Sequence, residues 1–405
     1  MSLTQTAVSA VVYFSKDDEI INGVHNLSKH EKSHSNYPAW LPTWDPRQKF
    51  PKLLPFKHVD RAFFGDVEYK NLFDSADGEV SYRQITPKLG TEVKSGIQLS
   101  NLDDKAKDDL ALLVAKRGVV VFRNQDLKEK GPAFAKKWGE YFGPLHVHPT
   151  SGAPDGFPEF HVVYRREGTD VEENKKKIFA FRNKNVGWHS DVTYELQPPG
   201  ITTFINIKTP ESGGDTIFAD TIEAYERLSP QLKKMIDGLQ VAHTSRDQAN
   251  NSIAQGGIER REPVDNIHPL VRWHPVLKKK ILFLQKGFGR RILGLKVEES
   301  DALLDFLFNH VESAHDLQLR ANWEEGTVVL WDNRRVIHSA IFDWDTPAAR
   351  HAVRITPQAE RPVASEEEYL NWDPEVELKS QEHIDQILKT PPAEVYELLE
   401  SLKNK

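Results

Sequence analysis

The sequence predicts a mainly β fold, a β-sandwich or jelly roll that also carries helices, in a chain of 405 residues. Short runs rich in β-branched and aromatic residues recur along the chain, separated by Gly, Pro, Asn and Asp. Such spacing is typical of antiparallel β folds. The helical patterns gather at the start of the regular region and in a middle insert instead of alternating with strands, which argues against an α/β fold.

The composition limits the function. Apolar residues make up 39% of the chain and the net charge is −7, with no long basic block. A packed core is therefore expected, and a nucleic-acid partner is not. The chain has no cysteine, which excludes disulfides, thiolate metal sites, iron–sulfur clusters and a cysteine nucleophile. Any metal must be held by His, Asp or Glu.

The location of the protein is also an expectation from composition. The N-terminal stretch "MSLTQTAVSAVVYF" has no basic region before its apolar patch and no clear cleavage site, so we expect no signal peptide. No apolar run approaches the roughly 20 residues that a membrane helix needs. A cytoplasmic protein without a membrane partner is the simplest expectation.

Residues 1–85 differ from the rest and form a predicted N-terminal extension. The stretch "YPAWLPTWDPRQKFPKLLPF" (37–56) is rich in Pro and aromatic residues and has no helical or alternating period. It predicts an extended, partly irregular segment that wraps the core, with Trp40 and Trp44 as anchors. A partly disordered tail is the alternative for residues 1–36.

Residues 86–358 form the regular region. Helices are predicted at 102–118, 132–143, 221–239 and 298–311, and strands at 118–125, 201–208, 213–220, 326–333, 334–344 and 350–357. The first helix begins with acids and ends with Lys, Arg and Gly, and Ser229-Pro230 marks a new helix start inside the third. Residues 359–405 predict a charged, helical C-terminal tail.

The stretch "GWHSDVTY" places His189 and Asp191 two residues apart in a strand-like run. Residues i and i+2 of a strand point to the same face. Together with a distant histidine they would form the facial triad of non-haem iron oxygenases. His338, in a late apolar strand, is the strongest third candidate. A surface histidine beside a turn aspartate is the alternative reading.

The stretch "RHAVR" places Arg350 and Arg354 on one face of a strand, with Ala352 between them. Their α-carbons would lie roughly 13 Å apart in an extended strand. Two arginines on an inner face are costly unless each meets an anion. The alternative is that both are exposed or paired with acids just before them.

Taken in order, these motifs resemble the iron- and 2-oxoglutarate-dependent dioxygenases of the taurine and sulfonate family. The resemblance covers residues 86–357 and rests on "WHSDVTY", "GGDT", "IHPLVRWHP", "FLQKGFGRRI", "LWDNRRVIH" and "RHAVR". It implies a double-stranded β-helix (jelly-roll) core with flanking helices. The long N-terminal extension and acidic tail are similar to those of fungal sulfonate dioxygenases.

The resemblance also implies residue roles. His189, Asp191 and His338 would be the catalytic ligands of Fe(II); Thr216 and Arg350 would bind 2-oxoglutarate; His148, Asn185, Phe288 and Arg354 would contact the substrate, with Trp331 close to the iron. His148 capping a loop is the alternative for that residue. For Phe288 and Trp331 a role in the core alone is the alternative.

The implied reaction uses Fe(II), 2-oxoglutarate and dioxygen to hydroxylate the carbon next to sulfur in an organosulfonate such as taurine. Sulfite, an aldehyde, succinate and carbon dioxide would be released, for sulfur assimilation. An alkyl sulfate ester or an aryloxyacetate is the alternative substrate. A non-catalytic metal- or ligand-binding jelly roll and a zinc hydrolase are alternatives from other classes. A homo-oligomer is an expectation of the resemblance alone.

Two departures bear on the substrate. Ser151 stands where the taurine enzymes have a tyrosine, three residues after the second histidine of "HVH". The stretch 245–257 does not align securely with the family's lid segment.

Overall fold

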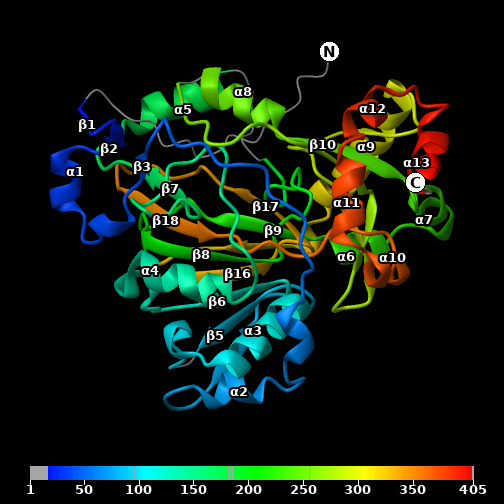
Figure 1. The fold of residues 1–405 in the computed structure, drawn as a ribbon. Helices are drawn as coiled ribbons and strands as arrows, with labels where there is room; N and C mark the ends of the chain where they lie inside the picture. Colours follow the sequence, from blue (N-terminus) through cyan, green and yellow to red (C-terminus); the bar gives the residue numbers. More distant parts are fainter. Residues whose placement is uncertain (1–16, 95, 181–182, 184–186, 255, 404–405) are drawn as a thin grey trace.

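Two β-sheets packed face to face form the centre of the molecule (Figure 1). The computed structural model describes residues 17–94, 96–180, 183, 187–254 and 256–403. The large sheet has seven strands, in the order β4 (Ser81–Gln84), β5 (Thr91–Lys94), β6 (Val119–Phe122), β16 (Val328–Asp332), β8 (Ile201–Lys208), β18 (Arg350–Ile355) and β7 (His161–Arg165). The smaller sheet has the order β15 (Gln318–Ala321), β9 (Thr216–Asp220) and β17 (Val336–Ala340).

Apolar side chains from both sheets pack into a core between them. β16 sends Val329 and Trp331 toward the smaller sheet, where they belong to one cluster with Phe218 of β9. Its alternate residues Val328 and Leu330 face the helices on the outer side. Because side chains alternate along a strand and both faces of this sheet are covered, the central strands are buried on both sides. The predicted mainly β sandwich with flanking helices is confirmed.

Helices α3 (Asp104–Arg117) and α4 (Leu127–Glu140) cover the outer face of the large sheet (Figure 1). The Asp103 carboxylate caps α3 by accepting from the Ala106 N–H, and Gly118 ends it with a φ of 72°. These ends agree with the predicted helix at 102–118. The predicted helix at 132–143 corresponds to the second half of α4, which follows a kink at Gly131 (φ 83°).

The middle insert forms a second core beside the smaller sheet. It contains α6 (Thr221–Glu226), α7 (Pro230–Ile236), β10 (Gln240–Thr244), α8 (Arg246–Ala254), β11 (Asp265–Pro269), β12 (Val271–His274), β13 (Lys279–Leu282), β14 (Gly289–Ile292), α9 (Val297–Ser313) and the 3-10 turn η4 (His315–Leu317). The Ser229 hydroxyl accepts from the Leu232 N–H, so the predicted helix start at this position is confirmed.

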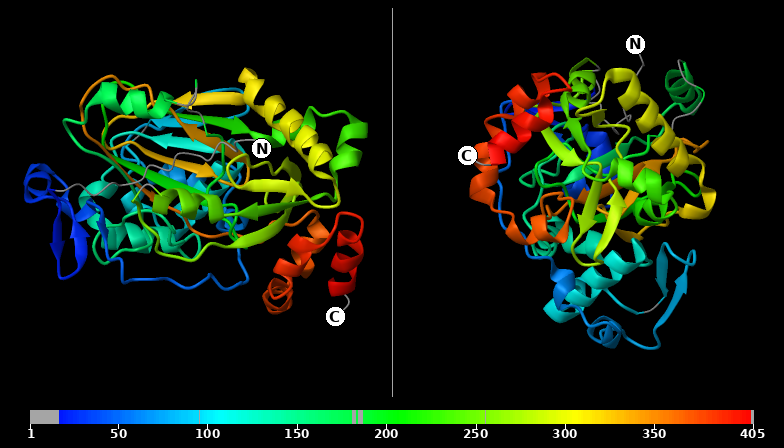
Figure 2. Two further views of the ribbon diagram at one scale, coloured as in Figure 1. Left: turned by 90° about the horizontal axis from the view of Figure 1, so that it is seen from above. Right: turned by 90° about the vertical axis from the view of Figure 1, so that its right-hand side faces the viewer.

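The elements β1 (Glu19–Ile21), β2 (Val24–Asn26) and α1 (Lys29–His34) lie at one end of the sandwich and the C-terminal helices at the other (Figures 1 and 2). The N-terminal part also contains η1 (Pro38–Trp40), β3 (Thr43–Trp44), η2 (Arg61–Phe64) and α2 (Lys70–Asp74); η3 (Leu99–Asn101) and α5 (Val171–Phe179) lie further along the chain. The C-terminal part contains α10 (Glu366–Asn371), α11 (Pro374–Gln381), α12 (Ile384–Lys389) and α13 (Val395–Lys403). None of the described helices has the length and apolarity to cross a membrane.

Both expected tryptophan anchors have contacts with the rest of the protein. The indole of Trp40 is buried and donates to the Lys128 carbonyl at 2.8 Å. Trp44 is half-buried and stacks on His25 with ring centroids 5.0 Å apart. From here the chain runs along the molecule toward the C-terminal helices (Figure 2), where the Lys57 ammonium donates to the Trp372 carbonyl.

A buried group of charges joins both end segments to the β16–β17 turn. The Arg334 guanidinium pairs with Asp332 at 2.8 Å, with Glu360 at 3.2 Å and with Asp60. Asp60 comes from the N-terminal extension and Glu360 from the segment after β18. His58, Asp60 and Glu360 are also close enough together to hold a metal ion. Because Arg334 pairs with both carboxylates, we interpret this group as an ion-pair cluster and not as a metal site.

Candidate active site

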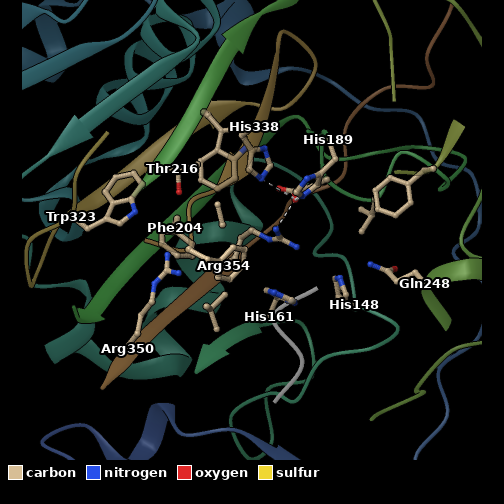
Figure 3. A pocket seen from close by; sticks show the side chains of 17 residues that line it. His148, His161, His189, Phe204, Thr216, Gln248, Trp323, His338, Arg350 and Arg354 are labelled. Atoms are coloured by element: carbon tan, nitrogen blue, oxygen red, sulfur yellow. Dashed lines mark hydrogen bonds and ion pairs between the residues drawn. The ribbon is translucent and has the colours of Figure 1, made fainter. Parts of the chain in front are cut away.

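The candidate site lies between the two sheets and is lined by residues of both (Figure 3). His338 comes from β17, Arg350 and Arg354 from β18, Trp331 from β16 and Thr216 from β9. The sheets therefore bring together residues that stand far apart in the sequence.

His189 and Asp191 do not lie in a regular strand, so the strand-like reading of this segment was wrong. Backbone hydrogen bonds of 2.9 and 2.7 Å join His189 to His338 in an isolated bridge. The chain then turns, and Val192 adopts a φ of 43°, which is strained for a β-branched residue. The Asn333 side chain holds this turn, because it accepts from the Asp191 N–H at 2.7 Å and donates to the Asp191 carbonyl at 3.1 Å.

The three predicted metal-binding side chains converge. The Asp191 Oδ1 atom lies 3.7 Å from His189 Nε2 and 3.6 Å from His338 Nε2, and the candidate ligand atoms are all within 4.8 Å of one another. His189 Nδ1 is 2.7 Å from the Gly187 carbonyl, so it carries the proton and leaves the Nε2 lone pair free. Asp191 Oδ2 is buried without a hydrogen-bond partner. Two imidazoles and one carboxylate in this arrangement fit a divalent transition metal.

The protonation states of His189, His338 and Asp191 also favour metal binding. Burial lowers the pKa of His338 to about 3, and it also lowers the pKa of His189. Burial raises the pKa of Asp191, but Arg354 and the two imidazoles outweigh it, so the net pKa falls below the ordinary value. At neutral pH the cluster therefore offers neutral imidazoles and a carboxylate, which are the forms that bind metals.

Arg350 is a buried cation without a carboxylate partner among the described residues. It is 5% exposed, its Nε atom is buried without a hydrogen-bond partner, and its guanidinium lies 5.9 Å from the centre of the Trp344 ring. Burial, followed by repulsion from Arg165, lowers the pKa of Arg350 to about 10. The nearby acids Asp215 and Asp343 pair with Arg320 instead. The structure therefore excludes an exposed or acid-paired Arg350.

Arg354 lies next to the cluster. Its Nη1 atom donates to Asp191 Oδ1 at 2.5 Å, and its Nε atom is buried without a partner. Arg350, Ala352 and Arg354 face inward, while Val353 and Ile355 face the outer helices. The predicted alternation of this strand is confirmed.

Aromatic side chains form the walls of the pocket. The Trp331 ring lies 5.0 Å from the His338 ring and 5.6 Å from the Phe218 ring. The Phe288 ring meets His189 edge-on at 6.2 Å and Tyr194 at 4.9 Å. Trp331 and Phe288 therefore contact the core and line the pocket at once, so neither is a core residue alone.

Comparison with known proteins agrees with this geometry. Residues 81–356 match the family described as "Taurine catabolism dioxygenase TauD, TfdA family". The chain is 52% identical to the alpha-ketoglutarate-dependent sulfonate dioxygenase of Saccharomyces cerevisiae, over 87% of this chain and 84% of that protein. Its fold matches the crystal structure of a taurine dioxygenase from Burkholderia xenovorans with a TM-score of 0.56 and 28% identity, over 71% of this chain and 91% of that one.

This chain belongs to the TauD/TfdA family. A second fungal relative, the alpha-ketoglutarate-dependent dioxygenase cnsM of Penicillium expansum, is 37% identical over 81% of this chain and 91% of its own length. Alpha-ketoglutarate is another name for 2-oxoglutarate. The predicted dioxygenase class and the jelly-roll core of this family are thereby confirmed.

Two of the predicted substrate contacts are His148 and Asn185. His148 lines the pocket, and its Nδ1 atom accepts from the Thr150 N–H at 3.2 Å, so the loop-capping and pocket roles coexist. Asn185 lies outside the described residues.

The two positions that depart from the family pattern, Ser151 and the segment 245–257, differ in their relation to the pocket. Ser151 is fully buried and its hydroxyl donates to the Gly152 carbonyl at 3.1 Å; it is absent from the lining of the pocket among the described residues. From the other segment, Gln248 of α8 lines the pocket and accepts from the Tyr194 hydroxyl at 2.9 Å.

Several residues of the dioxygenase site escaped the sequence reading. His161 and Gln248 line the pocket, and Asn333 and Gln285 bind the backbone of the His189–Asp191 segment. The alternation of "HVVYR" places His161 and Val163 on one face, but the sequence carried no sign of what that face meets.

Proposed function

We propose that this chain is an Fe(II)- and 2-oxoglutarate-dependent dioxygenase that hydroxylates the carbon next to sulfur in an alkyl sulfonate. The hydroxylated product would break down to an aldehyde and sulfite, with succinate and carbon dioxide as the other products, and the sulfite would serve sulfur assimilation. The name of the yeast relative supports this substrate class. The observation that carries the proposal is the pair of inward-facing arginines on β18, with Arg350 buried and Arg354 half-buried beside the His189–Asp191–His338 cluster.

The three side chains of this cluster would hold the metal. When bound, Fe(II) supplies the oxidising chemistry with 2-oxoglutarate and dioxygen, and a facial set of three protein ligands leaves room for both. The bridge between His189 and His338 fixes the distance between the two imidazoles. The Asn333 amide fixes the backbone of Asp191. The protein therefore preorganises all three ligands for metal binding.

Arg350 and Thr216 would bind the far carboxylate of 2-oxoglutarate. A guanidinium presents two parallel N–H groups that match a planar carboxylate. The Arg350 Nε atom has no hydrogen-bond partner among the described residues, and Thr216 lines the same pocket. The carboxylate would thus offset the cost of burying the Arg350 charge.

Arg354 and His148 would bind the sulfonate. Asp191 is the only acid among the described residues that line the pocket, against two arginines. The excess of positive charge favours two anions, the 2-oxoglutarate and the substrate. Phe288 and Trp331 would exclude water around the reacting carbon and position it.

One aerobic assay tests the proposal. Fe(II), 2-oxoglutarate and a panel of taurine, other alkyl sulfonates, an alkyl sulfate and an aryloxyacetate would be supplied, and succinate, sulfite and sulfate would be measured. Sulfite equal to succinate with a sulfonate is the expected result. Sulfate, or succinate without either sulfur product, would move the substrate to a sulfate ester or a carboxylate.

The variants Arg354→Met and Arg350→Met separate the two anion sites. Arg354→Met should weaken sulfonate binding while succinate formation continues without sulfite. Arg350→Met should raise the 2-oxoglutarate requirement instead. A sulfonate dependence unchanged in Arg354→Met would show that the substrate anion lies elsewhere.

A further inference from the structure

His161 is a buried histidine in the pocket. It is 5% exposed and lines the same pocket as Arg354. The two residues stand directly opposite each other where β7 pairs with β18, and directly opposite side chains lie close together on one face. The His161 and His148 rings are 4.4 Å apart, and both lie beside Arg354 (Figure 3).

The ring of His161 has no recorded hydrogen-bond partner among the described residues. Its Nδ1 atom is fully buried and unpartnered. Burial, followed by repulsion from Arg354, holds the pKa of His161 well below its ordinary value, so the ring is neutral and has one N–H to donate. A buried polar group without a partner is costly. The proton of the neutral ring therefore belongs on Nε2, which is not among the fully buried unpartnered atoms and is left to donate to a ligand in the pocket.

The neighbouring His148 has a defined tautomer. Its Nδ1 atom accepts from the Thr150 N–H at 3.2 Å, and burial keeps the pKa of His148 well below its ordinary value. The single proton of the neutral ring must therefore be on Nε2. Arg354, His148 and His161 thus bring N–H donors from three different chain segments to one end of the pocket.

Ser151 explains why an additional donor is useful here. This position holds a tyrosine in the taurine enzymes that the sequence resembles, and the serine hydroxyl is directed to the Gly152 carbonyl instead. The loop that carries His148 therefore supplies one donor to the pocket, and β7 supplies another through His161.

We propose that His161 is a specificity-determining substrate contact, which donates to one oxygen of the sulfonate while Arg354 and His148 bind the other two. The inference rests on the proposed function and deepens it. A sulfonate has three equivalent terminal oxygens, whereas a carboxylate has two. Three donors at one end therefore select anions with three terminal oxygens, the sulfonates and sulfate monoesters, over carboxylates.

The test compares two ligands of similar length, pentane-1-sulfonate and hexanoate. Binding to the metal-loaded enzyme with 2-oxoglutarate, without dioxygen, would be followed by the fluorescence of Trp323 and Trp331, which line the pocket. His161→Leu should weaken pentane-1-sulfonate binding by about 10- to 100-fold, the usual effect of losing a hydrogen bond to a charged group. Hexanoate binding should change far less.

Two further variants make the result specific. His161→Asn retains an N–H donor and should recover part of the sulfonate affinity. Val163→Ala, two residues along the same face of β7, is the matched control and should affect both ligands equally. The KM for 2-oxoglutarate should be the same in all variants, which also reports correct folding.

The possible failures are distinguishable. Equal losses for pentane-1-sulfonate and hexanoate in His161→Leu would overturn the role of His161, and so would unchanged sulfonate binding. If His161→Leu does not fold, a His161→Asn variant whose affinities for pentane-1-sulfonate and hexanoate fall equally would overturn it as well. If the unaltered enzyme neither binds nor converts any sulfonate, the proposed function fails together with this inference.

Discussion

Arg350 gives the sharpest prediction, because its charge is buried and has no carboxylate partner among the described residues. Burial lowers the pKa of Arg350 from 12.5 to about 10. A tenfold change in acidity corresponds to about 1.36 kcal/mol, so the charged form costs the folded protein on the order of 3 kcal/mol. The lowered pKa disfavours the cation, and the full cost is present at every pH below about 10.

The perturbation is Arg350→Met, which keeps an unbranched side chain and removes the charge. Without 2-oxoglutarate, the variant should be more stable than the unaltered protein by up to about 3 kcal/mol, since the buried charge at position 350 is gone. With 2-oxoglutarate, two charge-assisted hydrogen bonds are lost, at about 1.5–3 kcal/mol each. The dissociation constant for 2-oxoglutarate should then rise by about 100-fold or more.

Thermal unfolding with and without 2-oxoglutarate measures both effects. The unaltered protein should gain about 2.7 kcal/mol of stability at a 2-oxoglutarate concentration 100 times its dissociation constant, and Arg350→Met should gain almost none at the same concentration. Arg354→Met is the control, because it removes a neighbouring arginine and should keep the response. An Arg350→Met protein that is less stable alone and still responds to 2-oxoglutarate would refute the reasoning.

Three other changes have expected outcomes. Asp191→Asn should lower Fe(II) affinity by more than the roughly 10- to 100-fold that is typical of losing a residue that hydrogen-bonds to a metal ligand. Equilibrium dialysis measures this affinity, and full iron retention would contradict the assigned ligand set. Burial lowers the pKa of His351 to about 4, so the contribution of His351 to stability is complete above pH 6.5 and is lost as the pH falls toward 4. His351→Gln should therefore reduce the pH dependence of the free energy of unfolding in urea across this window, whereas His30→Gln, at an exposed position, should leave it unchanged. Asp60→Asn should destabilise the protein by about 3 kcal/mol in urea unfolding, because Arg334 loses a buried partner; unchanged stability would show that the N-terminal extension is not part of the folded core.

The helices and central strands were predictable because their signals are local. The Asp103 cap and the Gly118 end of α3 depend only on residues within a turn of each helix end, and the Ser229 cap is equally local. The alternation of β18 also follows from its own six residues. Sequence patterns therefore predicted these elements and which face of β18 carries both arginines.

The segment around His189 was predicted less well. Its residue types favour a strand, but Asn333 and Gln285 hold it as a bridge and a turn. These partners stand far away in the sequence, and a side chain that binds a distant backbone leaves no periodic signal. The same reason hid Gln248, whose α8 segment has no secure counterpart in the family that the sequence resembles.

By itself, the sequence determined the reaction class, because the candidate ligands and both arginines stand in motifs whose order and spacing are characteristic. Only the tertiary structure decided how these side chains are paired. Arg350 lacks a carboxylate partner because Arg320 takes the nearby acids, and His161 lies opposite Arg354 because β7 pairs with β18 in one particular register. The physical reason is that charge pairing and strand register depend on contacts between segments that only folding brings together.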